Sequence, residues 1–177
     1  MTVVTTVQAT MADRAEDEFG TRDVGRLFDV HHARLYRLAR RLSGSRDDAL
    51  DLVQETFLRM VRAGDRVPHG PSAEEAWLVR VLVNLARDGR RRFTVRTRHR
   101  AALVVSERHD PESAYLARVA VQTALASLGG RRRAVVVLHE MEGESVERIG
   151  RLLGIAAVTV RWHLFRARRE LARSLGV

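Results

Sequence analysis

One stretch, residues 142–171, constrains this chain more than any other, because its pattern is that of two amphipathic helices joined by a tight turn. Ser145 can cap a first helix whose apolar residues recur every three or four positions. Gly154 suits the left-handed position that closes a helix, and Ile155 can fold back as the apolar contact beyond it. A second apolar stripe starts just after Thr159. Two such helices about a glycine predict a helix-turn-helix, whose second helix enters the DNA major groove by its first residues.

The face of the second helix opposite its apolar stripe is rich in arginine. If its first turns lie in the major groove, the residues expected to face base edges are Thr159, Arg161, Trp162 and His163. Arginines farther along are expected near phosphates, which fix the register without reading sequence, and these are Arg166, Arg168, Arg169 and Arg173. The alternative is an ordinary helical hairpin with a solvated basic face, which this stretch by itself does not exclude.

The charge balance fits a nucleic-acid partner. The 177 residues carry a formal net charge of +9, and no lysine is present. Arginine binds phosphate and guanine in a bidentate manner, although coding bias would equally explain the missing lysine. The absence of cysteine excludes disulfides, thiolate zinc sites and cysteine nucleophiles. No apolar run approaches the roughly 20 residues needed to span a bilayer, and no signal peptide pattern opens the chain, so we expect a soluble cytoplasmic protein.

Helical periodicity dominates the chain, and no stretch alternates like a half-buried strand, so we predict an all-α fold. Two small helical domains are expected, the first over residues 24–93 and the second, with four helices, over residues 112–177. A flexible arm over residues 1–23 would precede them, and a flexible linker over residues 94–111 would join them.

The spacing of apolar residues also places the individual helices. In the first domain we expect helices over residues 24–42, from Ser45 to Val61 and from about Glu74 onward, with a loop over residues 63–73. In the second domain we expect helices over residues 113–128 and 131–141 beneath the helix-turn-helix.

The helix that follows Ser45 has an acidic outer stripe in an otherwise basic protein. Its outward residues are Asp47, Asp48, Asp51, Gln54 and Glu55. A solvated face is the usual explanation, but an acidic helix in a nucleic-acid-binding protein also favours a protein partner. The helix from about Glu74 ends in an arginine cluster and contains Asn84, the one asparagine of the chain, which taken alone would more often brace a helix.

Together these motifs resemble the extracytoplasmic-function sigma factors of bacterial RNA polymerase, the reduced members of the sigma-70 family that keep only the second and fourth conserved regions. Residues 47–59 are similar to the acidic helix that docks on the clamp helices of the polymerase β′ subunit. Residues 77–88 resemble the segment that melts and reads the minus-10 element, and residues 142–171 resemble the minus-35 reader. The likeness spans roughly residues 24–173.

The resemblance implies a specificity subunit without an active site, cofactor or metal. Its implied partners are core RNA polymerase, through the β′ clamp helices and the β flap, promoter DNA, and an anti-sigma factor that holds it inactive. The implied polymerase contacts are Asp48, Asp51, Gln54 and Glu55. The implied minus-10 residues are Asn84, Arg87, Asp88, Arg90, Arg91 and Arg92. The implied minus-35 residues are Ser145, Arg148, Thr159, Arg161, Trp162, His163, Arg166 and Arg169.

In that scheme the loop over residues 64–72 and Asn84 would hold a base flipped from the non-template strand, since an amide can both donate to and accept from a base edge. The arginines that follow Asn84 would take phosphates, and the linker would thread the polymerase cleft.

The chain departs from the family at three positions of the minus-35 reader. Val158 stands where the family commonly has glycine, and Trp162 and His163 stand where small and basic residues are usual. Bulky Trp162 at a base-facing position would alter the promoter sequence that is read. The alternative for Trp162 is burial in the core, the commoner place for tryptophan.

Two other classes of protein remain to be weighed. A stand-alone helix-turn-helix regulator would use the C-terminal helices but would need neither the acidic helix nor the helix from Glu74. An enzyme is disfavoured. His139 and Glu140 match the start of a zinc-protease motif, but Gly143 stands where the second histidine belongs.

Overall fold

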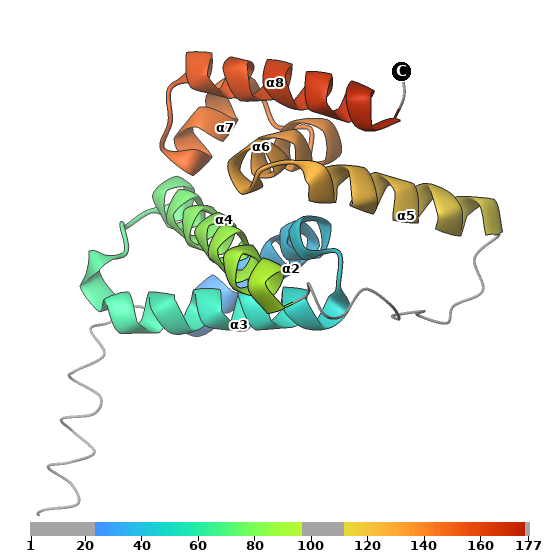
Figure 1. The fold of residues 1–177 in the computed structure, drawn as a ribbon. Coiled ribbons are helices and arrows are strands. Elements are labelled where there is room, and N and C mark those ends of the chain that lie inside the picture. Colours follow the sequence, from blue (N-terminus) through green and yellow to red (C-terminus); the bar gives the residue numbers. More distant parts are fainter. Residues whose placement is uncertain (1–23, 97–111, 176–177) are drawn as a thin grey trace, which may run out of the picture.

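The computed structural model describes residues 24–96 and 112–175, and all regular structure within these two ranges is helical. The first range contains α2 (Val24–Ser43), α3 (Arg46–Ala63), the short 3₁₀ helix η1 (Gly64–Arg66) and α4 (Pro71–Arg96). The second contains α5 (Glu112–Ser127), α6 (Gly130–Val136), the π-helical turn η3 (Val137–Met141), α7 (Val146–Leu153) and α8 (Ala157–Leu175) (Figure 1). The prediction of an all-α fold is confirmed.

Capping chemistry explains where the helices of the first range start and stop. The Ser45 hydroxyl accepts a hydrogen bond from the Asp48 backbone N at 3.4 Å, as the sequence predicted. Gly64, with a φ of 51°, closes α3. Helix α4 begins at Pro71 rather than near Glu74, because proline has the backbone angle of a first helical residue and lacks the amide hydrogen that would go unpaired there. The expected loop is therefore shorter than predicted.

Other predictions of element boundaries differ only slightly from the structure. Helix α4 continues to Arg96, into the stretch expected to be linker, and α5 starts at Glu112. The predicted helix over residues 131–141 is a short α-helix followed by the wider turn η3. The predicted arm over residues 1–23 and residues 97–111 of the predicted linker lie outside the described residues.

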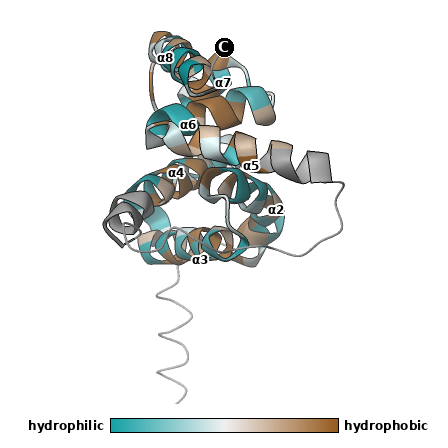
Figure 2. Cartoon of the chain, turned by 45° about the vertical axis from the view of Figure 1, so that its right-hand side comes forward, coloured by the Kyte–Doolittle hydropathy of each residue, from teal (hydrophilic) through white to brown (hydrophobic). Residues whose placement is uncertain are grey.

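The two ranges share one continuous hydrophobic core. Helices α2, α3 and α4 pack together, and α6, α7 and α8 form a second group of packed helices. Helix α4 lies between the groups and contacts α2 and α3 on one side and α6 and α7 on the other (Figure 1). The core residues from all these helices fall in a single buried cluster. Each helix mixes hydrophilic and hydrophobic residues, as expected of amphipathic helices around a core (Figure 2).

Within the described residues, none of the helices has both the length and the hydropathy that a membrane crossing requires.

One arginine is part of this core. Arg133 of α6 is only 4% exposed. Its guanidinium donates to the backbone oxygens of Leu125 at 2.6 Å and Ala126 at 2.8 Å, near the end of α5, and of Leu42 at 3.1 Å, near the end of α2. A cation at the C-terminal end of a helix can hydrogen-bond to its last carbonyls and interacts favourably with the helix dipole. Arg133 thereby caps the C-terminal ends of two helices from different halves of the molecule.

Acidification is expected to destabilise the fold through His31. The residue is 7% exposed, its Nε2 has no hydrogen-bond partner among the described residues, and burial is the main cause that lowers its pKa below the ordinary value. Glu75 and Glu74 raise this pKa less than burial lowers it, and Arg26 and Arg34 add to the lowering. The unfolded chain therefore binds a proton at a pH where the folded chain does not.

The free energy of unfolding should consequently fall as the pH drops below about 6.5, with a slope of at most about 1.4 kcal/mol per pH unit from this one proton. Urea unfolding between pH 7.5 and 5.5 measures the slope. The variant His31→Gln, which cannot titrate, should show a shallower dependence. An equal slope in both proteins would exclude His31 as the source.

Candidate DNA-binding and partner-binding surfaces

Helices α7 and α8 form the turn that the sequence predicted. The Ser145 hydroxyl accepts from the Arg148 backbone N at 3.1 Å, and Gly154 adopts the left-handed conformation with a φ of 66°. The Ile155 backbone N then donates to the Gly150 carbonyl at 3.0 Å. A Cβ on Gly150 would lie 2.8 Å from the Ile155 carbonyl oxygen, so the turn requires glycine here. Sequence reasoning missed Gly150, whose signal was a glycine inside a helical pattern.

Helix α8 buries one face and exposes the other. Val160, Leu164 and Ala167 are buried, whereas the opposite face is exposed. Trp162 is 52% exposed, so its alternative place in the core is wrong. The predicted minus-35 residues that lie on the exposed face are Arg161, Trp162, Arg166 and Arg169.

Thr159 and His163 lie at the edge of that face and are partly buried. His163 Nδ1 is buried without a hydrogen-bond partner among the described residues. Burial chiefly, and then the charges of Arg131 and Arg132 on α6, lower the His163 pKa below its ordinary value. The lowered pKa favours the uncharged ring, and the contact of His163 with a base edge stays a prediction.

Two arginines of α8 form exposed ion pairs with other described residues. Arg161 pairs with Glu147 at 3.1 Å and Arg168 pairs with Glu140 at 2.9 Å, and all four side chains are about half exposed or more. Exposed pairs of this kind contribute at most about 1 kcal/mol. A phosphate could replace either carboxylate, so the exposed face of α8 can present several arginines to a polyanion.

The acidic stripe of α3 borders a cavity. Asp48, Asp51 and Glu55 line a space of about 500 Å³ that is also lined by residues of α4, α5 and α6. Glu55 pairs with Arg59 of its own helix at 3.0 Å, whereas Asp51 is exposed and has no ion pair with another described residue. Gln54 is exposed. The predicted partner-binding side chains thus share one face of α3 and are accessible.

The predicted minus-10 residues all lie on α4. Asn84 is partly buried, and the exposed Arg87 donates from Nε to Asp88 Oδ1 at 3.2 Å. The aliphatic part of Arg87 lies against α6, since a Cβ on Gly130 would come within 2.9 Å of Arg87 Cγ. The remaining three, Arg90, Arg91 and Arg92, follow on the same helix, and their side chains lie outside the described ones.

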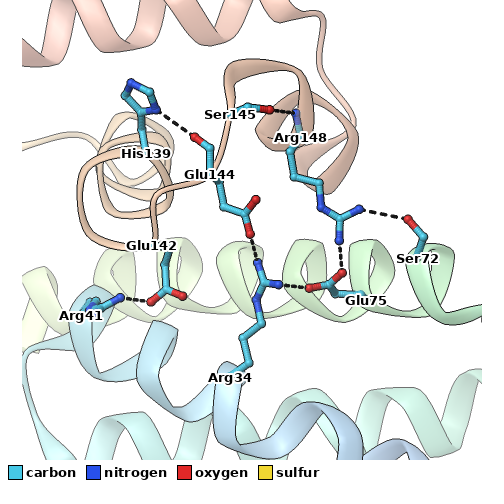
Figure 3. Close-up of polar contacts among 9 residues, drawn as sticks. All are labelled: Arg34, Arg41, Ser72, Glu75, His139, Glu142, Glu144, Ser145 and Arg148. Carbon is cyan, nitrogen blue, oxygen red and sulfur yellow. Dashed lines mark hydrogen bonds and ion pairs between the residues drawn. The ribbon is translucent and has the colours of Figure 1, made fainter.

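A cluster of ion pairs joins the two halves of the molecule. We define this interdomain ion cluster as Arg34, Arg41, Glu75, Glu142, Glu144 and Arg148. The Glu75 carboxylate receives hydrogen bonds from both Arg34 and Arg148 (Figure 3). Arg34 also pairs with Glu144, and Arg41 pairs with Glu142 (Figure 3). The cluster therefore connects α2 and α4 to α7 and the segment before it.

Arg148 is the member of this cluster that sequence reasoning assigned to DNA. Its guanidinium donates to the Ser72 hydroxyl at 3.1 Å as well as to Glu75. The His139 Nδ1–H donates to the Glu144 carbonyl at 2.9 Å, which fixes the chain next to the Ser145 cap (Figure 3). The side chain of Glu75 is 12% exposed and that of Arg148 is 25% exposed, so solvent screens this pair less than the pairs on α8. In this arrangement the Arg148 guanidinium is bound to two residues of α4.

Removing the charge of Glu75 is expected to loosen the contact between the two halves. In Glu75→Gln, two arginines would converge on a neutral amide whose nitrogen donates rather than accepts. We expect the closed arrangement to lose about 2 kcal/mol, less than for a fully buried pair because the arginines keep contact with water. The chain has no cysteine, so labels can be placed at Arg46→Cys on α3 and Ser174→Cys on α8.

Pulsed electron resonance between these labels should report longer and more dispersed distances in Glu75→Gln than in the parent. The matched control is Glu147→Gln, which removes an exposed carboxylate paired with Arg161 inside one half of the molecule. The control should keep the parent distances. Unchanged distances in Glu75→Gln would show that the cluster does not hold the halves together.

Comparison with known protein families identifies both halves. Residues 27–96 match the family model described as sigma-70 region 2, and residues 118–171 match the model described as sigma-70 region 4.

Among curated proteins, the chain is 40% identical over 169 residues to the ECF RNA polymerase sigma factor SigE of Mycolicibacterium smegmatis. That match covers 90% of this chain and 64% of the relative, so the chain spans a little less than two thirds of SigE. It is 37% identical over 152 residues to the ECF RNA polymerase sigma factor SigM of Mycobacterium tuberculosis, covering 85% of this chain and 76% of the relative.

Solved structures give the same fold. The chain is similar to the sigma factor RpoE of Bartonella quintana in complex with the anti-sigma factor NepR, with a TM-score of 0.63 and 25% identity over 88% of this chain and 98% of that one. It is also similar to CnrH in complex with the cytosolic domain of CnrY, with a TM-score of 0.60 and 28% identity over 86% of this chain and 87% of that one.

Proposed function

Because the chain belongs to the sigma-70 family, in its extracytoplasmic-function group, we propose that it joins core RNA polymerase and directs initiation at promoters with a minus-10 and a minus-35 element. In this role it supplies specificity and has no catalytic step of its own. The observation that carries the proposal is the presence of both region 2 and region 4 in one chain, in that order. A stand-alone helix-turn-helix regulator would need region 4 alone.

Each surface described above has one proposed role in binding polymerase or DNA. The acidic face of α3, with Asp48, Asp51, Gln54 and Glu55, would bind the clamp helices of the polymerase β′ subunit, and region 4 would bind the β flap. Asn84 and the arginines of α4 would hold the opened minus-10 strand, where unstacked bases need polar pockets and phosphates need cations. The exposed face of α8 would enter the major groove at the minus-35 element.

The closed arrangement would have to open for this function. The two elements are separated by about 25 base pairs, or about 85 Å of duplex at 3.4 Å per pair. Helix α4, the proposed minus-10 reader, contacts α6 and α7 directly, and Arg148 is bound to it. Residues 97–111 between α4 and α5 are enough chain to extend for about 50 Å. We infer that binding to polymerase separates region 4 from region 2 and releases Arg148 for DNA.

The proposed location and regulation of the protein follow from its proposed partners. Core polymerase and promoter DNA are in the cytoplasm, and we place the protein there. Since a similar sigma factor was solved with a bound anti-sigma factor, we propose that a protein of that kind also holds this chain inactive.

The test of this function is reconstitution. The purified full chain is mixed with core RNA polymerase, a one-to-one complex is sought by size-exclusion chromatography, and run-off transcripts from genomic DNA are sequenced. We expect a stable complex whose transcripts start downstream of a shared two-part motif. A chain that binds duplex DNA but neither joins core polymerase nor starts transcripts would be a stand-alone regulator, and the proposal would fail.

A further inference from the structure

Helix α8 carries an apolar ridge on its exposed face. We define this ridge as Val158, Trp162 and Phe165, which are 69%, 52% and 57% exposed. Their spacing of four and three residues aligns them along one side of the helix, away from the buried Val160 and Leu164. A soluble helix usually places polar residues on such a face, so three large apolar side chains in line indicate a contact surface.

Arginines accompany the two aromatic members of the ridge. The Arg166 guanidinium carbon lies 5.9 Å from the centroid of the Trp162 ring, and that of Arg169 lies 5.6 Å from the centroid of Phe165. The His163 ring meets Trp162 edge-on with centroids 5.0 Å apart. Cation–π contacts of this kind favour one orientation of each ring and place positive charge directly beside it.

The positive charge of Arg166 and Arg169 indicates which kind of partner the ridge binds. An apolar protein surface would leave Arg166 and Arg169 without counter-ions, whereas a DNA groove is bordered by phosphates on both sides. Neither arginine has a carboxylate partner among the described residues, so both are available to phosphate. The ridge together with its arginines therefore fits a surface that is apolar in the middle and anionic at its edges, which is the floor and rim of a major groove.

In the major groove the apolar group that distinguishes one base pair from another is the C5 methyl of thymine. Val158 and Trp162 lie in the first two turns of α8, the part of a recognition helix that meets base edges. We propose that Val158 and Trp162 contact thymine methyl groups in the upstream promoter element, which makes Trp162 a specificity-determining residue of this chain. The proposal rests on the proposed function, because it assumes that α8 enters promoter DNA.

The experiment compares thymine with deoxyuridine, which pairs identically but lacks the methyl group. The full chain bound to core polymerase selects duplexes from a random library that covers the upstream element. The selected duplex is then remade with single deoxyuridine replacements at each thymine. We expect replacement at one or two positions to weaken binding by about fourfold each, the effect expected for losing one buried carbon group.

Two variants test whether the ridge is responsible. Trp162→Ala should bind thymine and deoxyuridine duplexes equally at the sensitive position, and Val158→Ala, a smaller change at a more exposed site, should reduce the preference at that position or its neighbour. Arg173→Ala, which removes a charge farther along the helix, should weaken binding without altering the preference. Circular dichroism should confirm that the exposed substitutions leave the helices intact.

The possible results distinguish failure of this inference from failure of the proposed function. A chain that joins polymerase and selects an upstream element, but binds thymine and deoxyuridine duplexes equally at every position, would overturn the ridge proposal alone. Wild-type discrimination that survives in Trp162→Ala and Val158→Ala would also overturn it. A chain that forms no complex with polymerase and selects no element would overturn both the proposed function and the inference, and would favour a protein partner for the ridge.

Discussion

Replacing Arg133 with methionine is expected to lower the free energy of unfolding by about 3 to 5 kcal/mol, although methionine fills a similar volume. The buried guanidinium satisfies backbone carbonyls of Leu125, Ala126 and Leu42, and the thioether of methionine cannot donate to any of them. Loss of a hydrogen bond to a buried or partly buried carbonyl costs on the order of 1 to 3 kcal/mol. The loss should affect both halves, because Leu42 belongs to α2 and Leu125 to α5.

Urea unfolding followed by circular dichroism measures this effect. The matched control is Arg132→Met, one residue earlier on the same helix, where the arginine makes a partly exposed pair with Glu170 at 3.0 Å. That substitution should cost no more than about 1 kcal/mol. If the two variants unfold at the same urea concentration, the burial of Arg133 contributes nothing specific to stability.

The helices were predictable because their signals are local. Ser45 and Ser145 each accept from the backbone N three residues later, and Gly154 takes the left-handed conformation that closes α7. Chemistry of this kind depends on a few neighbouring residues, and the sequence displays them directly. The start of α4 was placed too late because proline was interpreted as a loop residue, although Pro71 is also a favourable first residue of a helix.

The roles of individual arginines were not predictable in the same way. Arg133, Arg148 and Arg166 all lie on basic helices, yet one is buried on helix carbonyls, one pairs with a carboxylate 73 residues away, and one lies over an exposed indole ring. Helical periodicity shows which side of a helix is polar. It does not show what that side meets, because the neighbour comes from a distant part of the chain.

In the proposed function, Arg148 would link the closed arrangement to the DNA-bound state. Its backbone N binds the Ser145 cap in any arrangement that keeps α7 folded, while its side chain binds Glu75 only when the halves are closed. The proposed contact with phosphate would use the same guanidinium as the contact with Glu75, and the two contacts would compete. Promoter DNA and region 2 would then compete for region 4, and whatever weakens the interdomain ion cluster should favour the DNA-competent state.

Reversing Asp51 and Glu55 together to arginine is expected to lower the affinity for core polymerase by at least about a hundredfold, or about 3 kcal/mol. Both side chains lie on the accessible face of α3, and Asp51 has no ion pair with another described residue, so the first reversal disrupts no contact within the fold. The second reversal removes the exposed pairs of Glu55 with Arg59 and Arg62, at a cost of about 1 kcal/mol in all. The folded state should therefore survive while the polymerase contact is lost.

The matched control is Asp29→Arg combined with Asp65→Arg, which changes the net charge equally at exposed positions on α2 and η1. Fluorescence anisotropy with labelled chain and core polymerase measures both affinities, and urea unfolding verifies both folds. If the control loses affinity as much as Asp51→Arg with Glu55→Arg, the effect comes from overall charge rather than from the acidic face. If neither double variant binds more weakly than the parent, polymerase must dock elsewhere, and the assignment of α3 as the docking helix fails while the family membership of the chain stands.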